Sequence, residues 1–471
     1  MEAYKRLLGN IGFLTLSNFA TKILSFLLLP LYTRVLTTDE YGLFDLISTA
    51  VSLFVPILTL SVHEGILRYA LEKNSKHKDI FSVGVKYFFI SNIILCAALF
   101  VNRFFNISDL FVEYSFIFFL LFNLYSANGI VSYFVRGLGD IRRLSIGSCL
   151  SAFITLVLNI LFLTVFKLGL TGYFSATIIG QAAPIIYYFV CYKLWKYVSF
   201  KKSEMEKDIV RYSIPMIANS VSWWINGAAD RFFVSFFCGL GVNGIYSVAH
   251  KIPSIMSIFQ NIFTQAWSVS AVQDFDKDDK TGFYANTYET YNSFLVIICS
   301  FIICCSKVIA SVLYAKSFYM AWEVAPFLII STLFSGMSGY LGGILSALKK
   351  TDTFAKTSII TAIINVILNA GLVPLLGGVG ASVATAVAFF AMWILRLRTV
   401  CKYIPLRIDE KKTFLAYVLI SCQAVLMLIF NRNSKISIIQ LLIFSFIVIL
   451  YHKLYLEIIR KLWKFILGRR S

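Results

Sequence analysis

The feature that most constrains this chain is a series of apolar segments, each of roughly 20 residues, that runs from Ile11 to Leu456. A helix of that length crosses the roughly 30 Å hydrocarbon core of a bilayer. Backbone polar groups need internal partners there, so such segments form helices, whereas a transmembrane barrel has alternating segments of about 10 residues. Hydrophobic residues make up 58% of the 471 residues and charged residues 14%, too few for the surface of a soluble domain. The sequence therefore predicts an all-α polytopic membrane protein.

We predict about fourteen transmembrane helices from these segments. The first segment is too long for the apolar region of a signal peptide and has no A-x-A cleavage pattern, so we expect it to stay in the protein. All connections are short, so we expect no inserted soluble domain. The predicted spans lie near residues 11–33, 42–62, 81–101, 111–133, 145–166, 172–195, 213–238, 244–268, 290–313, 325–346, 358–376, 380–397, 413–430 and 437–456.

The excess of basic residues indicates membrane topology rather than a nucleic-acid partner. Lys and Arg number 43 against 24 Asp and Glu, which gives a net charge of +19. Most of these cations fall at the two termini and in alternate connections, such as residues 193–211 and 396–412. Cytoplasmic loops of membrane proteins carry such an excess. We therefore predict a multi-pass protein of the cell inner (cytoplasmic) membrane with both termini in the cytoplasm.

The sequence contains no motif for covalent chemistry. It has no G-x-x-x-x-G-K-[ST] phosphate loop, its nine cysteines include no C-x-x-C pair, and its four histidines show no metal-ligand spacing. We therefore predict a protein that is not an enzyme, with no catalytic residue, no cofactor and no metal.

The two sides of the polar linker at residues 196–208 resemble each other. Each opens a span with a similar tetrapeptide, Tyr41–Phe44 and Asn243–Tyr246. Three further elements recur in the same order: Gly139–Arg142 with Thr351–Phe354, Leu156–Leu161 with Val366–Gly371, and Leu170–Tyr173 with Val379–Ser382. Six spans on each side predict a parallel repeat about an axis normal to the membrane. We predict a six-helix bundle at residues 1–200, a second at 201–405, and two additional transmembrane helices with a basic cytoplasmic tail at 406–471.

Several motifs resemble those of bacterial polysaccharide flippases, the O-antigen and capsule repeat-unit translocases of the multidrug/oligosaccharidyl-lipid/polysaccharide superfamily. They are Leu29–Arg34, Thr38–Gly42, Tyr212–Met216, Asp230 with Arg231, and Gly244–Lys251. The resemblance covers roughly residues 5–400 and does not specify the sugar. It implies two six-helix bundles that move an undecaprenyl-pyrophosphate-linked oligosaccharide across the inner membrane. It also implies membrane lipid, a polysaccharide polymerase and other assembly proteins as partners.

Charged residues within the spans are the candidate substrate site. An ionised side chain at the bilayer centre costs about 2.5–3.5 kcal/mol, so such residues usually face a cavity. A cationic cavity suits a pyrophosphate group, which must exchange its hydration for charge-assisted hydrogen bonds. Snorkelling to the interface or a structural ion pair remains the alternative for each. The candidate cavity cations are Lys22, Arg34, Arg68, Lys86, Arg231 and Lys251, and the candidate counter-ions or coupling groups are Asp45, Glu64 and Asp230.

The sugar part of such a substrate needs aromatic surfaces and polar side chains. Trp223, Trp224 and Asn226 in the seventh span are the candidates. Helix packing or lipid contact is the alternative explanation for the tryptophan pair.

The predicted function is translocation of a lipid-linked oligosaccharide by alternating access through a cationic central cavity. Two alternatives remain. One is a multidrug exporter of the same superfamily, coupled to Na⁺ or H⁺ through Asp45, Glu64 or Asp230. The other is an integral membrane polysaccharide polymerase or glycosyltransferase, which the short connections and the repeat disfavour.

Overall fold

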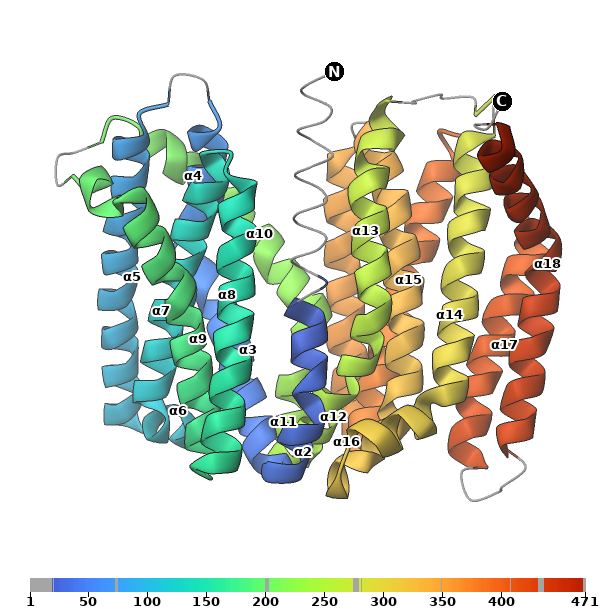
Figure 1. Cartoon of the computed structure of the whole chain (residues 1–471), viewed down its shortest axis with the longest axis horizontal. Helices are drawn as coiled ribbons and strands as arrows, with labels where there is room; N and C mark the ends of the chain where they lie inside the picture. The colour runs from blue at the N-terminus through green and yellow to red at the C-terminus, as the bar shows by residue number, and fades with distance from the viewer. Residues whose placement is uncertain are drawn as a thin grey trace. The chain divides into compact units, whose positions relative to one another are not determined.

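The computed structural model describes residues 19, 21–72, 75–199, 203–273, 279–280, 282–348, 350–406, 408–430 and 436–468. Every regular element in these ranges is a helix, which confirms the predicted all-α class (Figure 1). The first predicted span, at 11–33, lies partly outside the described residues, so the count of fourteen spans stays a prediction. Within the described ranges, nine helices are long and apolar enough to cross a membrane.

The chain divides into two compact units, Met1–Ser247 and Val248–Ser471. The predicted bundle boundary at residue 200 stays a prediction, because the first unit also contains the helices that follow the polar linker. The helices of the first unit are α2 (Leu29–Val35), α3 (Thr38–Leu58), α4 (Val62–Ala70), α5 (His77–Phe105), α6 (Asp109–Glu113), α7 (Ser115–Gly137), α8 (Ile141–Ile160), the π-helical η1 (Leu161–Val165), α9 (Gly169–Tyr192), the 3₁₀-helical η2 (Leu194–Tyr197), α10 (Glu206–Ala228) and α11 (Asp230–Cys238). Helix α12 (Leu240–Ala249) crosses the boundary, which follows Ser247.

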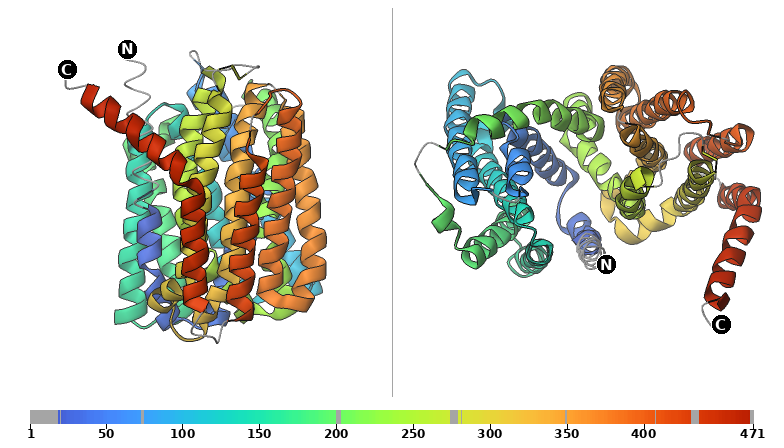
Figure 2. Two further views of the ribbon diagram at one scale, coloured as in Figure 1. Left: turned by 90° about the vertical axis from the view of Figure 1, so that its right-hand side faces the viewer. Right: turned by 90° about the horizontal axis from the view of Figure 1, so that it is seen from above.

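The second unit begins with α13 and contains the predicted last two spans. Its helices are α13 (Lys251–Gln273), α14 (Phe283–Leu313), the 3₁₀-helical η3 (Lys316–Met320), α15 (Ala321–Ala347), α16 (Thr351–Cys401), α17 (Glu410–Ile429) and α18 (Ile436–Gly468). Figure 2 shows α14, α17 and α18 as neighbours. Helix α15 is largely enclosed by its neighbours, and most of its side chains are buried.

Each unit contains a helical hairpin that closes at a glycine. In the first unit, α8 and η1 lead to Gly169, which has a φ of +55°, and α9 returns. In the second, Gly377 has a φ of +58° and interrupts α16, so that Asn365 donates a hydrogen bond to Thr385 on the returning half. Positive φ suits glycine because it has no Cβ. Helix α16 therefore supplies two predicted spans, and the two hairpins match the predicted sequence repeat.

A close helix crossing in the first unit joins the two tetrapeptides that first indicated the repeat. A Cβ on Gly42 of α3 would lie 2.0 Å from the carbonyl oxygen of Leu240, and one on Gly244 of α12 would lie 2.0 Å from that of Thr38. Asn243, fully buried, donates its side-chain amide to the Gly42 carbonyl at 3.0 Å. Thr38 precedes Leu240, and Gly42 precedes Gly244, by the same number of residues, so the contact is itself close to two-fold symmetric. Small residues allow such close approach of helix backbones in membranes.

We predict that Gly42→Ala lowers the melting temperature of the purified protein. The added Cβ would collide with backbone rather than a movable side chain, and overpacking costs about 1–3 kcal/mol. Gly129→Ala in α7 is the matched control, because nothing lies within 4 Å of a Cβ at that position. Equal melting temperatures for the two variants would contradict a tight α3–α12 crossing.

Candidate substrate site

An ion pair between α3 and α11 forms the centre of the polar cluster in the first unit. Nε of Arg231 lies 2.8 Å from Oδ2 of Asp45, and the two side chains are only 14% and 20% exposed. Ser247 of α12 donates its hydroxyl to the same Asp45 oxygen, and Arg231 also donates to the carbonyl of Gly227 at 3.1 Å. The candidate coupling group Asp45 and the candidate cation Arg231 therefore bind each other in this conformation.

Asp230, the residue before this arginine, is fully buried. Its Oδ2 accepts a hydrogen bond from the hydroxyl of Tyr246, which is also buried. A buried carboxylate is stabilised by such a donor, since isolated charge is costly in a low-dielectric interior. Adjacent residues 230 and 231 thus connect α11 to α12 and α3 respectively.

Glu64 lies beyond a break in the second predicted span. Helix α3 contains Pro56 and ends at Leu58, then Leu60 and Ser61 have positive φ values of 53° and 50° before α4 begins. Ser61 donates to the carbonyl of Pro56, so this interruption leaves fewer unsatisfied backbone groups. Glu64 sits in the first turn of α4, 34% exposed, with its Oε1 3.9 Å from Nε2 of His63.

Two further candidate cations have carboxylate partners. Arg68 of α4 lies 3.0 Å from Glu72, two residues beyond the end of that helix, with both side chains about half exposed. Lys86 of α5 lies 2.6 Å from Glu206, the first residue of α10, and the Tyr87 hydroxyl donates to the same carboxylate.

A second ion pair involves the residues just before α10. Lys76 lies 2.8 Å from Glu204, and its ammonium group holds the pKa of that carboxyl below its usual value. These contacts attach the predicted linker to the start of α5.

Lys22 and Arg34 differ from those residues. Both side chains are exposed, and neither forms a hydrogen bond or ion pair with another described residue. Lys22 lies in the helical stretch at 21–27 and Arg34 in the last turn of α2. Lys251 is the first residue of α13, in the second unit, and is partly exposed.

The three candidate sugar contacts have unequal access. Trp224 points its indole N–H at α3, donating to the carbonyl of Thr49 at 3.0 Å and the hydroxyl of Ser52 at 3.1 Å. Asn226 is buried and donates to the carbonyl of Ser222. Trp223 is 49% exposed. Of the three, Trp223 has the ring most available to a ligand.

Arg396 requires a correction. The sequence placed it among the cytoplasmic connection cations, but the structure buries it in α16 at 1% exposure. Its guanidinium donates to Thr357, to the Ser338 carbonyl and to Ser358, at 2.9–3.1 Å, and it lies over the ring of Phe354. The charge-count argument could not separate it from Arg398 two residues later, because neighbouring helical positions face different directions.

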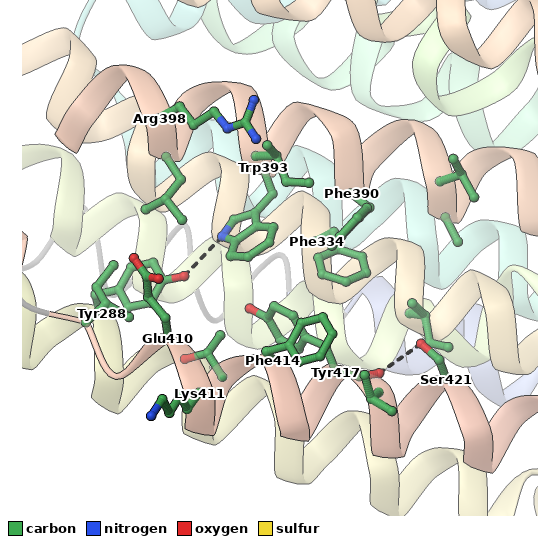
Figure 3. A pocket seen from close by; sticks show the side chains of 18 of the residues that line it. Tyr288, Phe334, Phe390, Trp393, Arg398, Glu410, Lys411, Phe414, Tyr417 and Ser421 are labelled. Atoms are coloured by element: carbon green, nitrogen blue, oxygen red, sulfur yellow. Dashed lines mark hydrogen bonds between the residues drawn. The ribbon is translucent and has the colours of Figure 1, made fainter. Parts of the chain in front are cut away.

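The second unit contains an apolar groove between α16 and α17, with walls from α14 and α15 (Figure 3). Its volume is about 870 Å³, which falls in the roughly 300–1,000 Å³ range of small-molecule sites. Trp393 and Tyr288 join across its wall by an N–H to hydroxyl hydrogen bond of 3.0 Å. Within the described residues, no group of three or more His, Cys, Asp or Glu side chains is arranged to hold a metal ion.

Comparison with known proteins identifies the family. Residues 7–269, more than half of the chain, match the model of the family described as "Polysaccharide biosynthesis protein". The chain belongs to this family. The resemblance inferred from its motifs is thereby confirmed at the family level, and the protein is a multi-pass membrane protein.

Relatives of known description agree with this family. The chain is 22% identical over 212 residues to the "Probable low-salt glycan biosynthesis flippase Agl15" of Haloferax volcanii, a match that spans 44% of each protein. Its fold is similar to that of the "Lipid II flippase MurJ" in an inward closed conformation, with a TM-score of 0.68 and 17% identity over 93% of this chain and 99% of that one. It is also similar to an inward-facing multidrug resistance MATE family transporter, with a TM-score of 0.62 and 15% identity over 83% and 95%. At these identities the two structures establish the fold.

We predict strong coupling between Asp45 and Arg231. Removing one partner of a buried ion pair leaves an uncompensated charge and costs about 3–5 kcal/mol. Asp45→Asn and Arg231→Gln should each lower the melting temperature, and the double variant should lose much less than the sum of the two. Thermal unfolding of the four proteins in detergent measures this coupling.

The exposed pair Arg68–Glu72 provides the control, because such pairs contribute about 0–1 kcal/mol. The corresponding Arg68→Gln and Glu72→Gln cycle should be close to additive. Additive losses in the Asp45–Arg231 cycle would show that the two charges do not stabilise each other.

Proposed function

We propose that this protein translocates an undecaprenyl-pyrophosphate-linked oligosaccharide, the repeat unit of an O-antigen, capsule or exopolysaccharide, from the cytoplasmic to the outer face of the inner membrane. The observation that supports this most strongly is the family match over residues 7–269. The partial similarity to a protein described as a glycan biosynthesis flippase supports it further. Transport is by alternating access through a cationic central cavity, and the protein is not an enzyme.

The contacts of the six candidate cations rank them for substrate binding. Arg68, Lys86 and Arg231 already contact carboxylates, so their charges are partly neutralised in this conformation. Lys22 and Arg34 have exposed side chains and no partner among the described residues. We therefore assign the first contact with the pyrophosphate to Lys22 and Arg34. Arg231 binds it at a later stage of transport, when Asp45 releases the arginine.

A competing role for carboxylates is ion coupling. Asp45, Glu64 and Asp230 are the groups that would bind Na⁺ or H⁺ in an exporter or in a coupled flippase. Protonation of Asp45 would weaken its ion pair with Arg231, because the pair depends on the carboxylate charge. Coupling through this residue would therefore release a cation for the substrate.

The sugar and the lipid tail need different surroundings. We assign the sugar contact to Trp223, whose half-exposed ring offers a stacking surface, with Trp224 and Asn226 supporting the helix behind it. The polyprenyl tail stays in the lipid during transport. A polysaccharide polymerase and other assembly proteins are the proposed partners that consume the product.

Surface-polysaccharide display tests this proposal in a strain that lacks the gene. The strain is complemented with the wild type, Lys22→Ala, Lys22→Arg or the exposed-lysine control Lys78→Ala, at matched protein levels. We expect display to be restored by the wild type, Lys22→Arg and Lys78→Ala. Lys22→Ala should reduce it by about tenfold or more, the factor for losing one charge-assisted contact of about 1.5–3 kcal/mol.

Full display with Lys22→Ala would keep the flippase and remove Lys22 from its anion site. Failure of the expressed wild type, with precursor synthesis intact, would contradict the polysaccharide substrate. Loss of dye efflux in Asp45→Asn or Asp230→Asn would then favour the multidrug exporter.

A further inference from the structure

Helix α18 is longer than a bilayer requires, and its last part leaves the bundle. Its 33 residues rise about 50 Å at 1.5 Å per residue, whereas the hydrocarbon core is about 30 Å thick. The apolar stretch Ile436–His452 belongs to the part that packs beside α14 and α17. Beyond it, Figure 2 shows the C-terminal part of α18 turning aside and extending past the neighbouring helices. About 20 Å of helix, from Leu456 to Gly468, is therefore left over after the span.

The order of residues gives this part of α18, the distal segment Lys453–Gly468, two different faces. At about 100° per residue, positions three or four residues apart share one side of a helix. One side carries four cations and one carboxylate, which are Lys453, Glu457, Arg460, Lys461 and Lys464. The opposite side is apolar and includes Leu456, Ile459, Leu462, Trp463 and Ile466. The distal segment is therefore a basic amphipathic helix.

Three other locations for the distal segment are unfavourable. Continuation into hydrocarbon would bury its cations, where an ionised side chain is costly. Projection into water would expose its whole apolar side, which is rare on a soluble surface. Packing against the bundle would cover that side, but the segment extends past the neighbouring helices. The membrane–water interface suits both faces, because apolar side chains can enter the acyl boundary while charged ones meet head groups.

We propose that the distal segment lies along the cytoplasmic surface of the membrane and binds its anionic phospholipids. The apolar side enters the boundary between head groups and acyl chains, and the cations contact lipid phosphates. Four cations against one carboxylate supply the charge complementarity, because each Lys or Arg near an anionic surface strengthens binding about fivefold. This role depends on the predicted cytoplasmic C-terminus and is independent of what the protein transports.

The start of the distal segment is attached to the bundle. Tyr451, just before it, is buried, and Nζ of Lys412 from α17 lies 4.7 Å from the centre of its ring. The hydroxyl of Tyr455 lies 3.5 Å from that of Ser293 on α14. These contacts set the point at which the helix leaves the span. Substitutions further along the segment can therefore change surface binding without removing the contacts that hold the span.

Depth-dependent fluorescence quenching of the full-length protein tests this surface contact. An environment-sensitive fluorescent amino acid replaces Leu462 on the apolar side or Lys464 on the charged side. Each labelled protein is placed in nanodiscs of phosphatidylcholine alone or of phosphatidylcholine with phosphatidylglycerol. Iodide quenches from the water, and brominated acyl chains quench from the bilayer, so the two quenchers together report the ratio of membrane-bound to water-exposed segment.

With phosphatidylglycerol present, we expect brominated lipid to quench the label at Leu462 while iodide does not, and the opposite at Lys464. Arg460→Gln with Lys461→Gln should lower the bound-to-exposed ratio about 30-fold in these nanodiscs, because two cations are lost at about fivefold each. The matched control is Lys356→Gln with Lys402→Gln, two exposed lysines of the same unit outside the segment, which should leave the ratio unchanged.

Three results would overturn the proposal. Iodide quenching of both labels in both kinds of nanodisc would place the segment in water. Shielding of both labels from both quenchers would place it against protein. Equal quenching by brominated lipid with and without phosphatidylglycerol, and in the charge variant, would remove anionic lipid as its partner. Because the readout is the position of the segment, none of these results affects the test of polysaccharide transport.

Discussion

The ion pair between Asp45 and Arg231 is the interaction on which the polar interior of the first unit depends. A charge inside a membrane helix is costly unless a partner compensates it, and this pair joins α3 to α11 at 2.8 Å. Ser247 from α12 adds a donor to the same carboxylate, and Tyr246 donates to one oxygen of the adjacent Asp230. Three helices are thereby held by charges that none of them could bury alone. In the proposed transport cycle, this pair must open before Arg231 can bind the substrate anion.

The close crossing of α3 and α12 makes this cluster geometrically feasible. Gly42 and Gly244 bring the two backbones together, and the buried Asn243 satisfies the carbonyl that the crossing exposes. The crossing and the helical hairpins at Gly169 and Gly377 are built from corresponding parts of the predicted repeat. A repeated sequence thus yields repeated backbone geometry, because a glycine is needed wherever φ is positive or two helices nearly touch.

Apolar and charged side chains are also segregated in the groove beside α17, which contains none of the proposed transport residues. Apolar side chains line most of it, and its charges gather at the end beside the connection from α16 to α17. The buried Arg396 and the exposed Arg398 lie two residues apart on α16. The guanidinium of Arg396 donates hydrogen bonds to three neutral acceptors inside the bundle. Arg398 faces the groove. A count of charges per connection treats them alike, which is why the sequence interpretation of Arg396 was wrong.

The helical class, the membrane environment, the repeat and the family could be predicted from the sequence, because these depend on segment length, apolar composition and local motifs. It also located the residues from which a site could be built, including Asp45, Arg231 and Trp223. The folded chain was needed to show which of these residues have partners. Asp45 and Arg231 are separated by most of the first unit, and a contact between distant residues depends on how helices pack rather than on periodicity. For the same reason, the exposure of Lys22 and Trp223, the burial of Arg396 and the groove between α16 and α17 became visible only in the folded chain.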